Sequence, residues 1–437
     1  MVEKYGMILN DKNEIESINY NIFVKYVLSH LILIYTSEGE FYYYTGSVYK
    51  RISNNEILRY VRDLFHEIIP EGWKVGYGNN VLSTLELAVE KVEELNTNPL
   101  KVNLLNGILN LETMKLTKHT PKFKSSIQLP ITYDPEAKCK KFRRFLKQIF
   151  DEDKELVRLV QEIMGYCLGQ SIDAQKAFIF LGAGANGKSV LLYILSKLVG
   201  KENISTLPLT DLESSFRRYA LVGKTLNMVT EAEFKTSAFS TNHFKAIVSG
   251  DSCTAEIKGG ALFTFQPTCK LVIALNAMPK VMDKSHGFKR RIIILPFDRI
   301  FKEYEQNKQL KYELEEELDG IFNFALKGLK RLRENDYNFT IPQRSQELMD
   351  SYFELNDPLS AFVKARIQEG VGKEKIPNRV LYEEYENWCI GEGIPFSNPS
   401  RPQFMNDLKN ILKMEGISFS IGSSNGERNL KGIRWKK

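Results

Sequence analysis

The central part of the chain contains short apolar runs in which nearly every position is hydrophobic. Unlike alternating or helical patterns, such runs are typical of parallel strands buried on both faces. They occupy residues 177–181, 225–230, 269–275 and 292–295. The first run is followed by residues 190–198, which have helical character and end before Gly200. The pattern predicts strands of a buried sheet, the first of which leads into a helix.

The first hundred residues have the pattern of a small α+β unit. Residues 31–44 form two apolar runs around the polar turn 37–40, which predicts a hairpin. Ser53 and Glu56 match a capping box, and the helical run 57–65 follows it. The aromatic residues of this unit are interpreted mainly as core, with stacking on bases as the alternative.

Two features connect this unit to the central strands. Residues 102–111 are apolar on both sides of Asn106-Gly107, which predicts a hairpin turning at that dipeptide. Residues 133–150 carry six lysines and arginines and precede a helical run at 156–168, so we expect a linker there. The basic residues of this linker either touch nucleic acid or form a solvated helix face.

The C-terminal part has a different pattern. Residues 308–333 are helical and rich in Leu and Glu, and Pro358 opens a last segment. In that segment, residues 380–390 read as one helix, and Ser400 caps a second. A hairpin of strands 417–421 and 429–435 then closes the chain and carries the basic residues Arg428, Lys431 and Arg434. Helices followed by a basic hairpin favour a winged helix that contacts DNA, and a packing domain with a positive rim is the alternative.

Composition narrows the class of protein only moderately. The chain has 437 residues, of which 43% are hydrophobic and 26% charged, as in an ordinary folded protein of two or three domains. No apolar stretch is long enough to span a bilayer, and we expect a cytoplasmic protein without a membrane role. Five cysteines without a C-x-x-C pair argue against a disulfide framework or structural zinc. The net charge of +6 mildly favours a polyanionic partner.

The turn after the first strand has the strongest chemical signal. It matches the phosphate-binding pattern G-x-x-x-x-G-K-[ST] through Gly182, Ala183, Gly184, Ala185, Asn186, Gly187, Lys188 and Ser189, with Val190 next in the helix. Glycines let backbone N–H groups surround phosphates, while Lys188 supplies a charge and Ser189 a hydroxyl ligand for Mg²⁺. Strand, loop and helix follow in the required order. We therefore expect ATP and Mg²⁺ as cofactors.

Further candidate residues stand at or near the ends of the other strands. Glu231 follows the second strand, with Glu233 close by, as expected for an acid that binds the metal or activates water. Asn276 follows the third strand, where an amide can orient the attacking water. Arg290 and Arg291 precede the fourth strand, and either can serve a neighbouring subunit's nucleotide or form a structural ion pair.

Residues 253–265 predict a hairpin inserted between the acid and the asparagine. Its turn is Lys258-Gly259-Gly260, and Lys245 lies shortly before it. A lysine at the tip of such a projection is suited to gripping a phosphate backbone. The alternative is a lysine that is merely exposed.

Together these motifs resemble a superfamily 3 helicase. More closely, the chain is similar to the poxvirus and phage/plasmid primase-helicase C-terminal family from residue 100 onward. The similarity rests on residues 103–111, 129–135, 161–166, 182–189, 230–233, 245–251, 275–279 and 290–297, and on the C-terminal tail. Members often carry a priming domain ahead of the helicase, for which the first hundred residues are too short. Asp151-Glu152-Asp153 spells D-x-D, but we interpret it as a helix start rather than a priming site.

The resemblance implies an AAA+ ATPase ring, usually hexameric, that acts on single-stranded DNA in replication of a virus, plasmid or mobile element. It implies Lys188 and Ser189 as ligands of phosphate and Mg²⁺, Glu231 as the acid and metal ligand, Asn276 as the sensor, Arg290 as the finger and Lys258 as a pore contact. Glu231-Ala232-Glu233 replaces two adjacent acids, so the choice between Glu231 and Glu233 stays open.

The expected fold is an α/β AAA+ core, a parallel sheet with flanking helices, at residues 173–345. An α+β region at 1–132 and a helical linker or collar at 133–172 precede it, and a winged-helix-like domain at 346–437 follows. The expected function is a replicative DNA helicase that acts on single-stranded and origin DNA as a homo-hexamer, with a separate primase or other replication proteins as further partners. The alternative is an ATP-switched initiator or loader that unwinds nothing. A small-molecule kinase would leave the hairpin and the arginine pair without a role.

Overall fold

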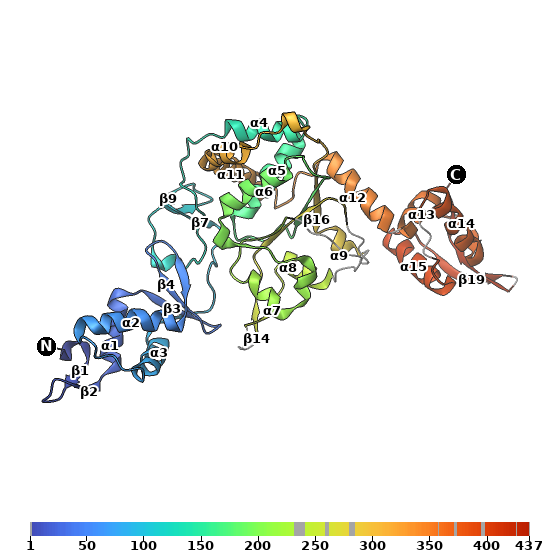
Figure 1. Ribbon diagram of the computed structural model, residues 1–437. Coiled ribbons are helices and arrows are strands. Elements are labelled where there is room, and N and C mark those ends of the chain that lie inside the picture. The colour runs from blue at the N-terminus through green and yellow to red at the C-terminus, as the bar shows by residue number, and fades with distance from the viewer. Residues whose placement is uncertain are drawn as a thin grey trace. The chain divides into compact units, whose positions relative to one another are not determined.

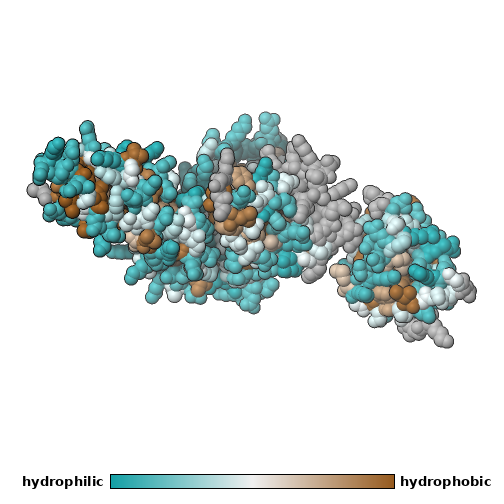
Figure 2. Space-filling view, turned by 90° about the horizontal axis from the view of Figure 1, so that it is seen from below, coloured by the Kyte–Doolittle hydropathy of each residue, from teal (hydrophilic) through white to brown (hydrophobic). Residues whose placement is uncertain are grey.

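The computed structural model describes residues 2–230, 241–257, 262–278, 285–356, 358–370, 374–394, 398–424 and 426–436. The chain divides into two compact units. The first reaches to Pro342, and the second contains the chain from Gln343 onward together with Met278 and the described residues 285–290. Among the described residues, no helix is long and apolar enough to cross a membrane. The face drawn in Figure 2 is mainly hydrophilic, with separate small apolar patches.

The N-terminal region of the first unit is built on a four-stranded sheet with the order β5-β4-β3-β6. Its elements are β1 (Met7–Leu9), β2 (Ile15–Ile18), α1 (Tyr20–His30), β3 (Leu33–Thr36), β4 (Phe41–Tyr44), β5 (Tyr49–Ile52), α2 (Asn54–Ile68), α3 (Tyr77–Ala88) and β6 (Glu90–Val92). The predicted hairpin is present as β3 and β4. The capping box is present too, since Ser53 accepts from the Glu56 N–H and Glu56 from the Ser53 N–H. The aromatic side chains Phe23, Phe41 and Phe65 are buried in its core, as their main interpretation predicted.

The second predicted hairpin forms with its turn displaced by one residue. Strands β7 (Lys101–Leu104) and β8 (Gly107–Asn110) pair antiparallel, with Leu104 opposite Gly107. The two turn residues are therefore Leu105 and Asn106 rather than Asn106-Gly107. Gly107 is in β8 with φ 150°, where an added Cβ would lie 2.4 Å from the Thr117 carbonyl oxygen in β9 (Leu116–Thr117). The close third strand, which the dipeptide does not reveal, accounts for the glycine.

The segment expected to be a linker is part of the core. It forms α4 (Lys140–Ile149), which buries Phe142, Phe145 and Ile149, while its lysines and arginines are exposed. Of these, Lys141 pairs with Glu316 and Lys147 with Glu152. The basic residues thus lie on the solvent-exposed face of α4, whose apolar face is packed in the core. Contact of that face with nucleic acid stays a prediction.

Two helices pack at unusually short distance beside the sheet. In α5 (Lys154–Leu168), an added Cβ at Gly165 would lie 2.4 Å from the Ala325 carbonyl oxygen. In α11 (Leu318–Glu334), a Cβ at Gly328 would lie 2.0 Å from the Gln161 carbonyl oxygen. Only glycine allows this approach. The single helix expected at 308–333 is in fact α10 (Leu310–Glu315) and α11.

A residue between α10 and α11 makes a tertiary contact. The Glu317 carboxylate accepts hydrogen bonds from the backbone N–H groups of Lys141 and Phe142, at 3.1 and 3.0 Å. It therefore satisfies orphan donors at the start of α4. Glu317 directly precedes α11, so this contact links the start of α11 to the start of α4.

The centre of the first unit is a five-stranded parallel sheet with the order β11-β12-β15-β10-β16. Its strands are β10 (Ala177–Leu181), β11 (Ile204–Ser205), β12 (Leu226–Val229), β15 (Lys270–Leu275) and β16 (Ile292–Pro296). The helices α5, α6 (Lys188–Val199) and α11 lie on one side, and α7 (Ser215–Arg218) and α8 (Thr241–Ser249) on the other (Figure 1). The parallel sheet with flanking helices is present as predicted.

The second unit contains helices and short antiparallel strands. They are α9 (His286–Lys289), α12 (Gln343–Asn356), α13 (Pro358–Arg366), β17 (Ile367–Glu369), β18 (Lys375–Pro377), α14 (Asn378–Gly391), α15 (Arg401–Met414), β19 (Ser420–Ser424), β20 (Glu427–Lys431) and β21 (Ile433–Trp435). Ser400 caps α15, as predicted. The last predicted strand is divided at Gly432, φ 84°. As a result β20 pairs with β18 and β19, whereas β21 pairs with β17.

Candidate nucleotide-binding site

The phosphate-loop motif lies at the carboxyl edge of the parallel sheet. Strand β10 ends at Leu181, and α6 begins at Lys188. Residues 182–187 connect them, so the first backbone N–H groups of α6 face the loop. A helix N-terminus carries partial positive charge and unsatisfied donors, which favour a bound anion. The arrangement has the elements that phosphate binding requires.

The loop backbone adopts conformations that suit its glycines. Gly184 and Gly187 have φ of 100° and 85°, and Ala185 also has positive φ, at 48°. An added Cβ at Gly187 would lie 2.5 Å from Ile149 Cγ2 of α4. A side chain at Gly187 would therefore be both strained and obstructed. Helix α4, which lies in the segment predicted to be a linker, thus packs directly against the loop.

A segment that follows β16 holds the loop in this shape. The Asn186 side-chain amide donates to the Phe297 carbonyl oxygen at 3.1 Å, and the Phe301 N–H donates to the Ala185 carbonyl oxygen at 2.8 Å. Asn186 is 2% exposed, so its amide has no access to bulk water. We call residues 297–306 the strap. Its backbone fixes the loop at two successive residues.

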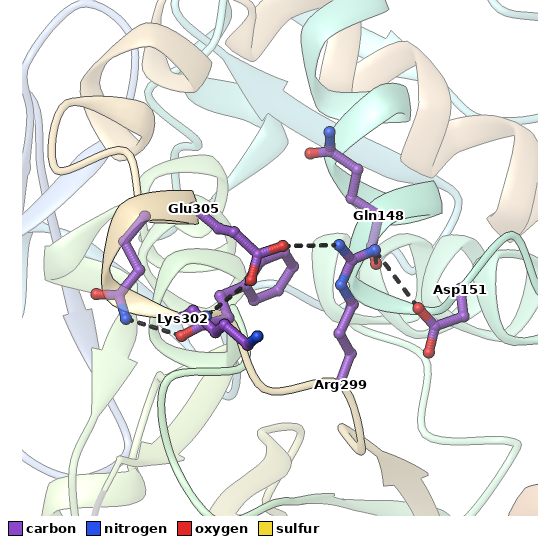
Figure 3. Close-up of polar contacts among 7 residues, drawn as sticks. Gln148, Asp151, Arg299, Lys302 and Glu305 are labelled. Atoms are coloured by element: carbon purple, nitrogen blue, oxygen red, sulfur yellow. Dashed lines mark hydrogen bonds and ion pairs between the residues drawn. The ribbon is translucent and has the colours of Figure 1, made fainter.

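Arg299 anchors the strap to the junction of α4 and α5 (Figure 3). Its guanidinium donates to the Gln148 carbonyl oxygen at 3.0 Å and lies 3.4 Å from an Asp151 carboxylate oxygen and 3.5 Å from one of Glu305. It also lies over the Phe301 ring, 4.6 Å from the centroid. Glu305 in turn accepts from the Lys302 N–H at 2.9 Å. The local sequence does not identify Arg299 as part of the site, because its partners Gln148 and Asp151 are far from it in the chain.

The Lys188 side chain is buried and held by three oxygen atoms. Its Nζ donates to the carbonyl oxygens of Gly182 and Leu275, both at 2.8 Å, and to Asn276 Oδ1 at 3.2 Å. Lys188 is 7% exposed, whereas Ser189 beside it is exposed at the start of α6. The structure therefore brings together the predicted loop lysine and the predicted asparagine from neighbouring parallel strands.

The remaining ATPase candidates are placed as follows. Strand β12 ends at Val229, and Glu231 and Glu233 lie outside the described residues. Arg291 is 9% exposed and donates from Nε and Nη2 to Ser249 Oγ at 2.9 and 2.7 Å. Arg290 is exposed and belongs to the second unit. Of the two arginines, Arg291 thus has an internal role within the first unit.

The predicted DNA-contacting residues lie on several elements. Lys245 is on α8. The predicted hairpin is present as β13 (Cys253–Glu256) and β14 (Leu262–Phe265), with Glu256 opposite Leu262, and Lys258 lies outside the described residues. Arg428, Lys431 and Arg434 are exposed on the strands of the second unit, where Arg434 faces Glu374 at 3.9 Å.

The D-x-D residues at 151–153 have three separate partners. Asp151 faces Arg299, Glu152 pairs with Lys147 at 3.2 Å, and the Asp153 side chain caps α5 through the N–H groups of Glu155 and Leu156. Within the described residues, no group of three or more potential metal ligands was found. The helix-start interpretation of Asp153 matches the geometry.

Family models match three stretches of the chain. The "D5 N terminal like" model matches residues 21–151, and the "Poxvirus D5 protein-like" model matches residues 354–431. Between them, a family of unknown function, DUF5906, matches residues 180–291, which include the phosphate loop. The chain contains D5-like domains. The resemblance to a poxvirus-type primase-helicase family is confirmed at this level, and it extends further toward the N-terminus than the sequence motifs indicated.

Curated relatives of the chain are viral proteins of low identity. A "Putative helicase" of Invertebrate iridescent virus 3 is 25% identical over 334 residues, which are 68% of this chain and 35% of the relative. A "Putative primase" of African swine fever virus is 23% identical over 376 residues, 78% of this chain and 38% of the relative. The chain thus spans little more than a third of the length of these relatives.

A solved structure shares the fold of the chain. The apo C-terminal region of NrS-1 superposes with a TM-score of 0.58 at 16% identity, over 96% of this chain and 100% of the other. At this identity the match reports the fold alone. It covers both the D5-like ends and the parallel sheet between them.

Proposed function

We propose that the chain is an ATP-dependent DNA helicase of replication that moves on single-stranded DNA as a ring. One observation carries the ATPase part: Lys188 Nζ, at the phosphate loop, lies 3.2 Å from Asn276 Oδ1 at the end of the adjacent strand. A phosphate-binding cation beside a strand-end amide is the arrangement that orients water against a terminal phosphate. The viral relatives named helicase or primase support the choice of DNA as substrate.

The residues at the loop fit ATP and Mg²⁺. The positive-φ glycines and the start of α6 offer backbone donors to the phosphates, and the exposed Ser189 hydroxyl is available as a metal ligand. Bound Mg²⁺ would neutralise phosphate charge. Lys188 would transfer its hydrogen bonds from backbone carbonyl oxygens to phosphate oxygens while Asn276 stays within reach. Glu231 or Glu233 would activate the water.

In a ring, an arginine of the neighbouring subunit would supply a further positive charge to each bound nucleotide. Arg291 is buried and donates to Ser249 in its own subunit, whereas Arg290 is exposed on the surface, so we assign the finger to Arg290. A homo-hexamer is the assembly implied by the resemblance. Its subunits would each complete the site of a neighbour.

DNA contacts would come from two places. The β13–β14 hairpin would carry Lys258 toward single-stranded DNA, with Lys245 on α8 as a second basic contact. In the second unit, α14 and α15 are followed by the basic β19–β20 hairpin, which supports a winged-helix-like domain for origin DNA. Partners would include a separate primase or other replication proteins, in bacterial or viral-host cytoplasm.

The competing proposal is an initiator or loader that uses ATP only as an assembly switch. A forked DNA substrate with purified full-length chain separates the two. The helicase requires ATP-dependent strand displacement that Lys188→Ala abolishes and that Lys258→Ala removes while basal hydrolysis persists. Nucleotide-dependent assembly without strand displacement would favour the switch, and normal unwinding by Lys258→Ala would refute the pore assignment. Particle mass with an ATP analogue and single-stranded DNA tests the ring, and a stable monomer would exclude it.

A further inference from the structure

A cleft of about 290 Å³ lies within the first unit, away from the phosphate loop. One wall comes from the N-terminal sheet and the segment after β6, and the other from residues 219–223, Ile257 and residues 263–266, which include most of β14. Neither the ATPase chemistry nor the proposed DNA contacts use the residues of this cleft. Its lining combines carboxylates with aromatic rings, which points to a ligand of definite chemistry.

Three of the carboxylates that line the cleft are exposed to solvent. Glu38, Glu93 and Glu94 line the cleft, and none of them forms an ion pair with a described residue. Three negative charges gathered around one opening repel a phosphodiester chain and attract a cation. The cleft is therefore unsuited to DNA, although it adjoins the hairpin proposed to grip DNA.

Aromatic side chains supply the second part of the lining. Tyr42, Tyr219, Phe263 and Phe265 face the same cleft. Burial raises the pKa of Tyr42 to about 12 and raises the pKa of Tyr219, so both phenols are neutral near pH 7. Neutral aromatic rings attract ammonium and guanidinium groups through their faces, and they pack against alkyl stems.

The chain itself places one cation at the rim in this manner. Arg51 of β5 pairs with Glu40 through Nε at 2.7 Å, donates to the Tyr219 hydroxyl at 2.9 Å, and lies over the Tyr219 ring at 6.0 Å. A carboxylate and an aromatic ring thus already hold a guanidinium at this edge. Arg51 neutralises Glu40, whereas the other three carboxylates form no ion pair with any residue that the structure describes.

A buried hydroxyl lies in the same lining. Thr36 is 5% exposed, and its Oγ1 has no hydrogen-bond partner among the described residues. A buried hydroxyl without a partner costs free energy. A hydroxyl both donates and accepts hydrogen bonds, so this one is compatible with a ligand N–H group as its partner.

We propose that this cleft binds an organic cation, an alkylammonium or guanidinium group of the kind carried by polyamines and by lysine and arginine side chains. The cation lies among Glu38, Glu93 and Glu94 and against the faces of Tyr42 and Tyr219. Its binding is independent of nucleotide and of DNA, so the inference does not rest on the proposed function.

Isothermal titration calorimetry on the full chain, without nucleotide or DNA, tests this site with two probes, spermidine and a lysine octapeptide. Saturable binding is expected for at least one probe. Spermidine alone would identify a free polyamine as the source, and tighter binding of the octapeptide would identify a protein segment. The triple variant Glu38→Gln/Glu93→Gln/Glu94→Gln is expected to weaken binding by about tenfold or more, because each exposed charge pair contributes modestly.

The matched control is Glu16→Gln/Glu136→Gln/Glu213→Gln, which removes three exposed carboxylates elsewhere in the same unit. It is expected to bind within about twofold of the unmodified chain. Tyr42→Leu keeps every charge and tests the ring, with an expected loss of about threefold. Absence of saturable binding for both probes, or equal weakening by the two triple variants, would overturn the proposal.

Discussion

Lys188 and Asn276 meet at the carboxyl edge of the sheet, with Nζ 3.2 Å from Oδ1, although one begins a helix and the other follows a strand. Lys188 also donates to two backbone carbonyl oxygens, so its ammonium group is fully engaged. A nucleotide must therefore compete for this lysine. This competition makes the side chains around it direct controls of affinity.

Replacing Lys188 with Ala should abolish ATP hydrolysis. The change removes the only cationic group that the described loop offers to phosphate, and loss of such a preorganised charge costs about 10²–10³ in rate. Steady-state hydrolysis measures the loss. The control is Lys197→Ala on the same helix, whose lysine pairs with Glu315 at 2.7 Å, and it should hydrolyse ATP normally. Residual hydrolysis of Lys188→Ala at the level of this control would disprove the site.

Two substitutions at Asn276 should separate binding from turnover. Asn276→Ala removes the amide that we propose orients the attacking water, so turnover is expected to fall by about tenfold or more while analogue affinity is kept. Asn276→Asp places a carboxylate against Lys188, and the new ion pair competes with phosphate, so analogue affinity falls as well. Binding of a non-hydrolysable analogue, measured beside turnover, distinguishes them. Identical effects of both changes on affinity would contradict this assignment.

Truncating Arg299 should loosen the phosphate loop. Arg299→Ala removes the anchor of the strap and should lower the free energy of unfolding by about 1 kcal/mol, since the guanidinium is partly exposed. The KM for ATP should rise severalfold with little change in turnover. Arg299→Lys should restore part of the affinity. Arg62→Ala, which removes an exposed pair with Asp63 on α2, serves as the control. An unchanged KM for Arg299→Ala would refute the strap's role.

One buried carboxylate forms part of the contact between α5 and α11. Glu162 is 1% exposed and accepts from Arg331 Nε at 2.7 Å and from the Thr340 N–H at 2.8 Å. Arg331→Ala leaves this carboxylate without its cation and should destabilise the chain by about 3 kcal/mol. Urea unfolding measures it. The neighbouring Lys330→Ala, which breaks only an exposed pair with Glu334, should cost less than about 0.5 kcal/mol.

Lys270 should make stability increase with pH in the alkaline range. Burial lowers its pKa to about 8, while its ammonium donates to the carbonyl oxygens of Gly169 and Thr268. The unfolded chain, with an ordinary lysine pKa of about 10.4, binds more protons between these values, so unfolding becomes less favourable as pH rises. The Tm of the unmodified chain relative to Lys270→Met should rise from pH 7.5 to about pH 10. A constant difference would exclude this linkage.

Local sequence patterns determined the elements that rely on neighbouring residues. The strand at 177–181, the loop glycines, the capping box of Ser53 and Glu56 and the Ser400 cap all depend on contacts within a few positions. Continuous apolar runs likewise predicted strands buried on both faces, because a strand covered on both faces has no solvent-exposed side that would carry polar residues. The sequence therefore predicted the sheet and the place of the phosphate loop on it.

Tertiary structure decided the features that depend on distant partners. The helix at 140–149 became part of the core because its apolar face packs beside the loop at Gly187. Glu317, directly before α11, caps α4 with its carboxylate although the two helices are far apart in the sequence. Lys188 and Asn276 make contact because neighbouring parallel strands end at the same edge of the sheet. Arg299 likewise contacts Gln148 and Asp151, which are far from it in the sequence. No local pattern encodes such pairings, since the atoms become neighbours only when the sheet has formed.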